Sequence, residues 1–303
     1  MTQKIIQIPT LNDNPQDFTQ LFGTWSEAND YYADICFDFS VCRFLRPTAV
    51  AFLGGLARLI ESRFGSVTFD WSTLHDSWVK TTIRQNGFAS VFGDPSAPWD
   101  GTSIPYREDS ALDMNGVMDY LTYDWLGKGW GKTHLSERVR DAIAGKMWEI
   151  YNNAFEHSDS KIGIFSCGQH FKRKNELCLS AIDFGLGIPA KIRNFVGTDS
   201  RAQSLPSDAC LRWAFTRGKS TCTGGVARGL GLDLLKEFIR VNQGKLEIYS
   251  NDGYALVDKD GERYENQDIS FEGTVVHITL RCDEKLYRFR DEAGVSMNRR
   301  RES

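Results

Sequence analysis

Three short motifs in the second half of the chain, and their order, constrain the fold more than any other feature. Residues 149–158 (EIYNNAFEHS) end a helical pattern and carry a carboxylate and a carboxamide one turn apart. Residues 183–187 (DFGLG) follow an apolar run, and residues 228–232 (RGLGL) open a second amphipathic stretch. An acid at the end of a buried strand can accept a hydrogen bond from a purine amino group, and glycine-containing turns let backbone N–H groups approach phosphates. Together the motifs predict a nucleotide site.

The composition is that of a globular protein and argues against several classes of function. A chain of 303 residues is long enough for two domains, and 41% hydrophobic with 25% charged residues is ordinary for folded domains. A formal charge of −4 gives no general electrostatic reason to bind nucleic acid or a membrane. No signal peptide or Cys-x-x-Cys pair is evident, and seven scattered cysteines indicate reduced thiols. We therefore expect a cytoplasmic protein.

The order and spacing of the three motifs resemble the Bergerat-fold (GHKL) superfamily. This superfamily includes gyrase, histidine kinases, the ninety-kilodalton heat-shock chaperone and anti-sigma-factor serine kinases. The resemblance runs from about residue 104 to about residue 282. It has a fourth element, residues 273–278 (GTVVHI), which contains Thr274 and is similar to the strand that closes the adenine pocket. The resemblance implies a two-layer α/β sandwich that binds ATP together with Mg²⁺.

Glu149 and Asn153 are four residues apart, so on a helix they lie on one face about one turn apart. The resemblance implies that this face meets the nucleotide. Asn153 would then bind Mg²⁺ through its amide oxygen, and Glu149 would be the general base that activates water or a hydroxyl. Such a base typically contributes about 10²–10⁴-fold in rate. A polar face exposed to solvent is the alternative for these two residues.

Asp183 follows the apolar run at residues 177–182, which is typical of a central strand, so we expect its carboxylate to be largely desolvated. A buried acid needs a hydrogen-bond donor. In the superfamily, the exocyclic amine of adenine supplies that donor. Gly185 and Gly187 would permit the turn and the close approach of the base, although a simple turn also accounts for them.

Gly229 and Gly231 stand at the start of a helical pattern, whose N–H groups and dipole favour an anion at that end. By the same resemblance, Arg228 is a candidate phosphate contact. The small and polar residues 216–225 are typical of a lid that orders over ATP, and Lys219 is a candidate contact for the γ-phosphate. A plain surface loop is the alternative for this stretch.

The front third of the chain has an α/β pattern. Residues 34–39 and 66–70 have the character of strands, and residues 47–64 combine a leading proline with apolar residues at helical spacing. This strand–helix–strand pattern resembles STAS domains, the fold of anti-sigma-factor antagonists. It predicts one β-α-β unit at the front of the chain.

The Gly- and Pro-rich residues 92–101 indicate a boundary between two domains. We predict a STAS-like regulatory domain over residues 1–100 and a Bergerat-fold ATP-binding domain over residues 101–303. The fold class of the whole chain is therefore α/β (α+β).

A STAS-type phosphorylation site would fall at the start of the helix predicted in the front third. STAS domains carry a phosphorylatable Ser or Thr there, usually after an Asp. Residues 46–48 read Arg-Pro-Thr, so the acid is absent and Thr48 is the hydroxyl that is left. An ordinary N-terminal helix residue is the simpler interpretation of Thr48.

These features predict a cytoplasmic regulator that binds Mg-ATP, hydrolyses it slowly and signals the nucleotide state to a protein partner. Glu149 fits this function, because ATPases and serine kinases must activate water or a hydroxyl, whereas histidine kinases usually have Asn there. One alternative is a serine/threonine kinase of the anti-sigma type, which would phosphorylate a STAS-containing partner or its own front domain. Another is a non-catalytic module gated by ATP. Dimers are common in the superfamily, so a homodimer is also compatible with the resemblance.

Overall fold

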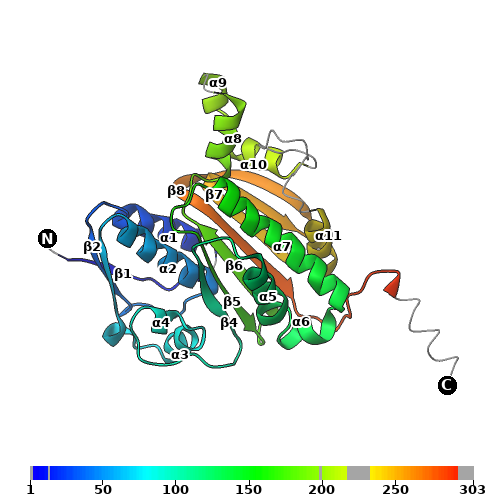
Figure 1. Ribbon diagram of the computed structural model, residues 1–303, viewed down its shortest axis with the longest axis horizontal. Coiled ribbons are helices and arrows are strands. Elements are labelled where there is room, and N and C mark those ends of the chain that lie inside the picture. Colours follow the sequence, from blue (N-terminus) through cyan, green and yellow to red (C-terminus); the bar gives the residue numbers. More distant parts are fainter. Residues whose placement is uncertain (1–2, 13, 198–199, 217–232, 293–303) are drawn as a thin grey trace.

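The computed structural model describes residues 3–12, 14–197, 200–216 and 233–292 (Figure 1). These residues form a mixed α/β structure. A three-stranded parallel sheet with its helices comes first in the chain, and a five-stranded antiparallel sheet with packed helices follows. The predicted α/β class is therefore confirmed. No helix in the described ranges combines the length and the apolar character that crossing a membrane requires.

The front segment alternates strands and helices. Its elements are β1 (Lys4–Gln7), α1 (Pro15–Ala28), β2 (Asp34–Asp38), α2 (Pro47–Ser62) and β3 (Ser66–Asp70). The strands run parallel in the order β1-β2-β3, as successive β-α-β units require. Pro47 occupies the first turn of α2, where its missing N–H has no helical partner to lose. The two strands and the helix predicted in this region are confirmed to within two residues.

A short helical region connects the two sheets. It contains the 3-10 helix η1 (Trp71–Thr73), α3 (Ser77–Gln85) and α4 (Phe88–Val91). Residues 92–102 that follow contain no helix or strand, in keeping with their Gly- and Pro-rich composition.

The second sheet is antiparallel throughout, in the order β4-β5-β6-β8-β7. Its strands are β4 (Ser103–Asp109), β5 (Ile164–Phe171), β6 (Glu176–Asp183), β7 (Lys245–Asp258) and β8 (Gly261–Arg281). β6 is the central strand, and its apolar run at residues 177–182 is buried, as predicted.

One face of this sheet is covered by α7 (Glu137–His157), which lies over the strands in Figure 1. Ser136 caps the helix by accepting a hydrogen bond from the Val139 N–H at 3.3 Å, as its residue type predicts. The apolar side of the helix buries Ile143, Met147 and Tyr151. The other described helices of this half are α5 (Met114–Asp119), the π-helix η2 (Tyr120–Trp125), α6 (Gly129–His134), α8 (Ile188–Val196), α9 (Ser200–Gln203), α10 (Ser207–Ala214) and α11 (Asp233–Asn242).

The opposite face of the antiparallel sheet is covered by the front segment. Helix α2 packs on β5 and β6, and α1 packs on β8. One hydrophobic cluster extends from the parallel sheet through α2 to the antiparallel sheet and includes Phe52, Phe165 and Phe271. A second cluster fills the space between the antiparallel sheet and α7. The sheet and the α7 layer therefore form a two-layer unit, on whose back the front segment adds a third layer.

Candidate functional site

The ends of three neighbouring strands bring Asp183, Thr274 and Ser250 together. The register pairs Asp183 of β6 with Thr274 of β8, and Thr274 with Ser250 of β7. Because directly opposite residues share one face of a sheet, the three side chains point to the same side. The hydroxyl oxygens of Thr274 and Ser250 are 2.9 Å apart. Asp183 and Thr274, both site residues predicted from the sequence, are thus neighbours in the fold.

The Asp183 carboxyl group is buried, with 5% of the residue exposed. Its Oδ1 accepts a hydrogen bond from the Gly185 N–H at 3.0 Å. Burial raises the pKa of Asp183 to about 7, although the Gly185 N–H and the hydroxyls of Ser158 and Thr274 favour the ionised form. Asp183 makes no ion pair with a described residue. It is therefore a strong acceptor whose described partners are all neutral donors.

Gly185 and Gly187 are glycines because other parts of the chain approach them closely. A Cβ on Gly185 would lie 2.0 Å from the carbonyl oxygen of Ser158. Gly187 has a φ of +80°, and a Cβ there would lie 2.7 Å from the Asn251 side chain. The predicted turn is therefore present, and the contacts that require both glycines come from within the protein.

Ser158 ends α7 next to this turn and joins the helix to the site. Its carbonyl oxygen accepts a hydrogen bond from the Leu186 N–H at 2.6 Å, and its hydroxyl interacts with Asp183. The residue is buried and forms the C-cap of α7. The C-terminal end of α7 is consequently fixed beside the Asp183 carboxyl group.

Ser250 and Asn251 belong to the site but were not identified from the sequence. The Ser250 hydroxyl accepts from the Ile188 N–H at 2.8 Å, and the Asn251 side-chain oxygen accepts from the Ala190 N–H at 3.2 Å. Both side chains therefore satisfy N–H groups in the first turn of α8. They lie within a strand in the sequence, and only the pairing of β7 with β8 brings them to Asp183.

Asn153 and Glu149 lie on α7, five and nine residues before Ser158. At 1.5 Å per residue, the helix places them about 8 Å and 14 Å along its axis from Ser158. Both residues are partly exposed. The Asn153 side chain makes no hydrogen bond to a described residue, whereas the Glu149 carboxylate pairs with Lys146. The two predicted residues thus share a helix face that is accessible to a ligand.

Four predicted contacts lie outside the described residues: Lys219, Arg228, Gly229 and Gly231. They fall between α10 and α11, which bound this stretch on either side. Their roles in phosphate binding stay predictions.

Among the predicted site residues that the structure describes, one offers a suitable ligand for a divalent cation. Mg²⁺ typically keeps several waters and binds one or two protein oxygens together with phosphates. The partly exposed Asn153 amide, which has no partner in the described ranges, fits this role. The same ranges contain no group of three His, Cys, Asp or Glu side chains arranged to hold a metal.

Comparison with known proteins gives a weak structural match. No protein-family model and no curated protein matches the chain. Among the solved structures that match is the histidine kinase domain of the blue-light activated histidine kinase from Erythrobacter litoralis EL346. It has 10% sequence identity and a TM-score of 0.26, and the match covers 88% of this chain and 95% of that chain.

Proposed function

We propose that the chain is an ATP-binding regulator whose nucleotide pocket is centred on Asp183. The observation that carries the proposal is a buried carboxylate at the end of the central strand, surrounded by neutral donors and with no cationic partner among the described residues. An ionised carboxylate has about four acceptor sites, so it can take a further donor beside these three neutral donors. The exocyclic amino group of adenine is a neutral donor of this kind. The Thr274 hydroxyl lies beside the Asp183 carboxylate, on the neighbouring strand.

The face of α7 that carries Asn153 and Glu149 would receive the phosphates. Asn153 would hold Mg²⁺ through its amide oxygen, and the metal would supply charge neutralisation at the phosphates. Glu149 would orient a water molecule and accept its proton. Because Lys146 pairs with Glu149 in the structure, that pair must open before Glu149 can act as a base. We also propose that hydrolysis is slow and depends on a protein partner, for which a STAS-containing protein is our candidate.

The proposal is tested by isothermal titration of the wild type with Mg-ATP, Mg-GTP and Mg-ADP, followed by the same titrations of Asp183→Asn. We expect the wild type to prefer adenine nucleotides and the variant to lose that preference, because the amide presents N–H groups where the carboxylate presents acceptors. Equal binding of ATP and GTP by the wild type would refute an adenine pocket at Asp183.

Incubation with γ-labelled ATP separates hydrolysis from phosphorylation of protein. The ATPase predicts free labelled phosphate, whose release falls about 10²-fold or more in Glu149→Ala. Label in protein would instead favour the serine/threonine kinase. In the described conformation the Thr48 hydroxyl is fully buried, so Thr48 is not accessible to a kinase. Tight binding without any turnover would indicate a non-catalytic module.

A further inference from the structure

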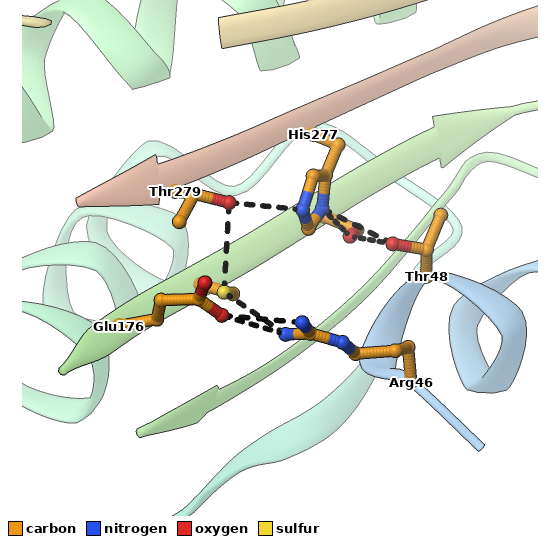
Figure 2. A network of polar contacts seen from close by, with 7 residues as sticks. Arg46, Thr48, Glu176, His277 and Thr279 are labelled. Carbon is orange, nitrogen blue, oxygen red and sulfur yellow. Dashed lines mark hydrogen bonds and ion pairs between the residues drawn. The ribbon is translucent and has the colours of Figure 1, made fainter. Parts of the chain in front are cut away.

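Helix α2 of the front segment contacts the back of the strands that carry the candidate pocket. Thr48, in its first turn, places its hydroxyl 2.7 Å from the Ser180 hydroxyl and 3.1 Å from Nδ1 of His277 (Figure 2). Ser180 and His277 are themselves joined, at 2.8 Å, and are directly opposite each other on β6 and β8. All three residues are fully or almost fully buried. We call these residues, together with those that extend them, the α2 polar network.

The α2 polar network continues along the same face of β6 and β8. Nε2 of His277 lies 3.1 Å from the Thr279 hydroxyl, which contacts the Cys178 sulfur at 3.6 Å. Arg46, the residue before α2, pairs with Glu176 at 3.1 Å, as Figure 2 shows. Its guanidinium group also contacts the Cys178 sulfur. Burial lowers the pKa of His277 to about 3, so its ring is neutral at physiological pH. A neutral ring can donate with one nitrogen and accept with the other. It can therefore hydrogen-bond to hydroxyls on both sides, because each hydroxyl can take either part.

A second contact between α2 and the pocket strands is apolar. Gly55, two turns after Thr48, lies against the ring of Phe184, and a Cβ on Gly55 would be 2.2 Å from that ring. Phe52 packs on Phe184 from the same helix, with ring centroids 5.2 Å apart. Phe184 directly follows Asp183 in the chain. The turn that holds the Asp183 carboxylate is thus supported by α2 from behind.

The geometry of the strands connects these contacts to the pocket. Ser180 precedes Asp183 by three residues on β6, and His277 follows Thr274 by three on β8. An odd spacing puts side chains on opposite faces of a sheet, and three residues span about 10 Å. The pairing of β6 with β8 is continuous from Glu176 to Asp183, with no bulge. A shift of α2 would therefore move the strand ends that carry Asp183 and Thr274.

We propose that α2 is a positioning element of the nucleotide site, acting through Thr48 on the β6–β8 pair and through Gly55 on Phe184. The inference rests on the proposed function, because it concerns how the same pocket is held in shape. It assigns the front segment a direct part in nucleotide affinity. Thr48 and Gly55 touch no nucleotide and are positioning residues only.

Gly55→Ala tests the apolar contact, and Gly23→Ala in α1 is its matched control, since a Cβ on Gly23 meets nothing within 4 Å. We expect Gly55→Ala to weaken ATP binding at least tenfold in isothermal titration and Gly23→Ala to leave it unchanged. Unfolding by urea is measured in parallel. A purely structural role for Gly55 would lower the free energy of unfolding but leave the Kd of the folded protein unaltered.

Thr48→Val and Thr48→Ser test the polar contact and keep the proposal testable if Gly55→Ala fails to fold. Valine removes the hydroxyl at nearly constant volume, whereas serine keeps it. We expect Thr48→Val to weaken ATP binding several-fold and Thr48→Ser to retain wild-type affinity. Dissociation constants within twofold of wild type for both Thr48→Val and Gly55→Ala, with lowered stability, would overturn the proposal.

Failure of the proposed function gives a different result: the wild type itself shows no binding of ATP. Amide hydrogen exchange then still reports on the positioning by α2. We expect the Gly185 N–H, which donates to Asp183, to exchange faster in Gly55→Ala than in Gly23→Ala. Equal exchange in the two variants would contradict the positioning of this turn by α2.

Discussion

At the scale of single residues, Asp183 combines a cost in folding stability with a proposed role in binding. Its ordinary pKa is 3.8, and burial raises the pKa to about 7 in the folded protein. An acid whose pKa is higher in the folded than in the unfolded state destabilises the fold as pH rises from the lower to the higher value. Above pH 7 the cost is complete and on the order of 4 kcal/mol. A ligand that donates to the carboxylate would offset it.

Replacing Asp183 by Asn should therefore stabilise the nucleotide-free protein in a pH-dependent way. The folded wild type carries the Asp183 charge only above about pH 7, and the variant lacks that charge at every pH. The difference in free energy of unfolding between variant and wild type should therefore be largest above pH 7. This difference should decrease by roughly 2–3 kcal/mol between pH 7 and pH 5. Urea unfolding at several pH values, without nucleotide, measures this difference. A difference that stays constant with pH would mean that Asp183 has an ordinary pKa in the fold.

Nucleotide affinity should fall at low pH for the same reason. In the proposed pocket the adenine amine would donate to the ionised carboxylate, and a group with a pKa of about 7 must first lose its proton. The expected Kd for ATP is about tenfold weaker at pH 6 than at pH 8. Asp183→Asn serves as the control, because any pH dependence that it keeps belongs to the nucleotide phosphates. If wild type and variant show the same profile, Asp183 does not contact the base.

At the scale of elements, α7 joins the two ends of the proposed site. Its C-cap residue Ser158 contacts the Asp183 turn, and its exposed face carries Asn153 and Glu149. The helix is held to the sheet by buried apolar residues and by the Tyr151 hydroxyl, 2.6 Å from the Ser166 hydroxyl. Packing on one side thus leaves the other side free for a ligand.

Asn153→Ala should weaken nucleotide binding while leaving the folding stability of the protein almost unchanged. The Asn153 side chain has no partner in the described part of the chain, so its removal should change the free energy of unfolding by no more than about 0.5 kcal/mol. The Kd for ATP in the presence of Mg²⁺ should rise at least tenfold, with a much smaller change in EDTA. Asn152→Ala, one residue away and about 100° around the helix, is the matched control. If the two variants change the Kd equally, Asn153 does not bind Mg²⁺ as proposed.

At the scale of the whole molecule, the front segment is part of the core of the second sheet. Phe52 of α2 packs with Phe184 and Phe271, and this cluster lies on the face away from α7. The sequence predicted two domains with a boundary near residue 100. The shared cluster means that separation at this boundary would expose a large apolar surface.

A fragment of residues 101–303 should consequently be less soluble than the full chain. Without α1 and α2, the back of the antiparallel sheet would present Phe165, Phe184 and Phe271 to solvent. We expect the fragment to bind a hydrophobic dye such as ANS and to aggregate at micromolar concentration, and the full chain to do neither. A monomeric fragment that binds no dye would show that residues 101–303 fold independently.

The sequence predicted several of the local elements, because their signals are local. Pro47 marks the start of α2, and the apolar run at residues 177–182 is the central strand. It also brought Asp183 and Thr274 to one candidate site. It gave no indication of Ser250 and Asn251, because a polar residue within a strand has no distinguishing pattern until the neighbouring strand is known.

Local order along the chain, such as periodicity, caps and the succession of motifs, was set by the sequence alone, because interactions within a few residues determine it. The tertiary structure alone decided that α2 packs on the back of β5 and β6 and that Thr48 hydrogen-bonds to His277, 229 residues further along. Contacts over such distances depend on how the layers stack to bury apolar surface, and no short segment encodes that choice.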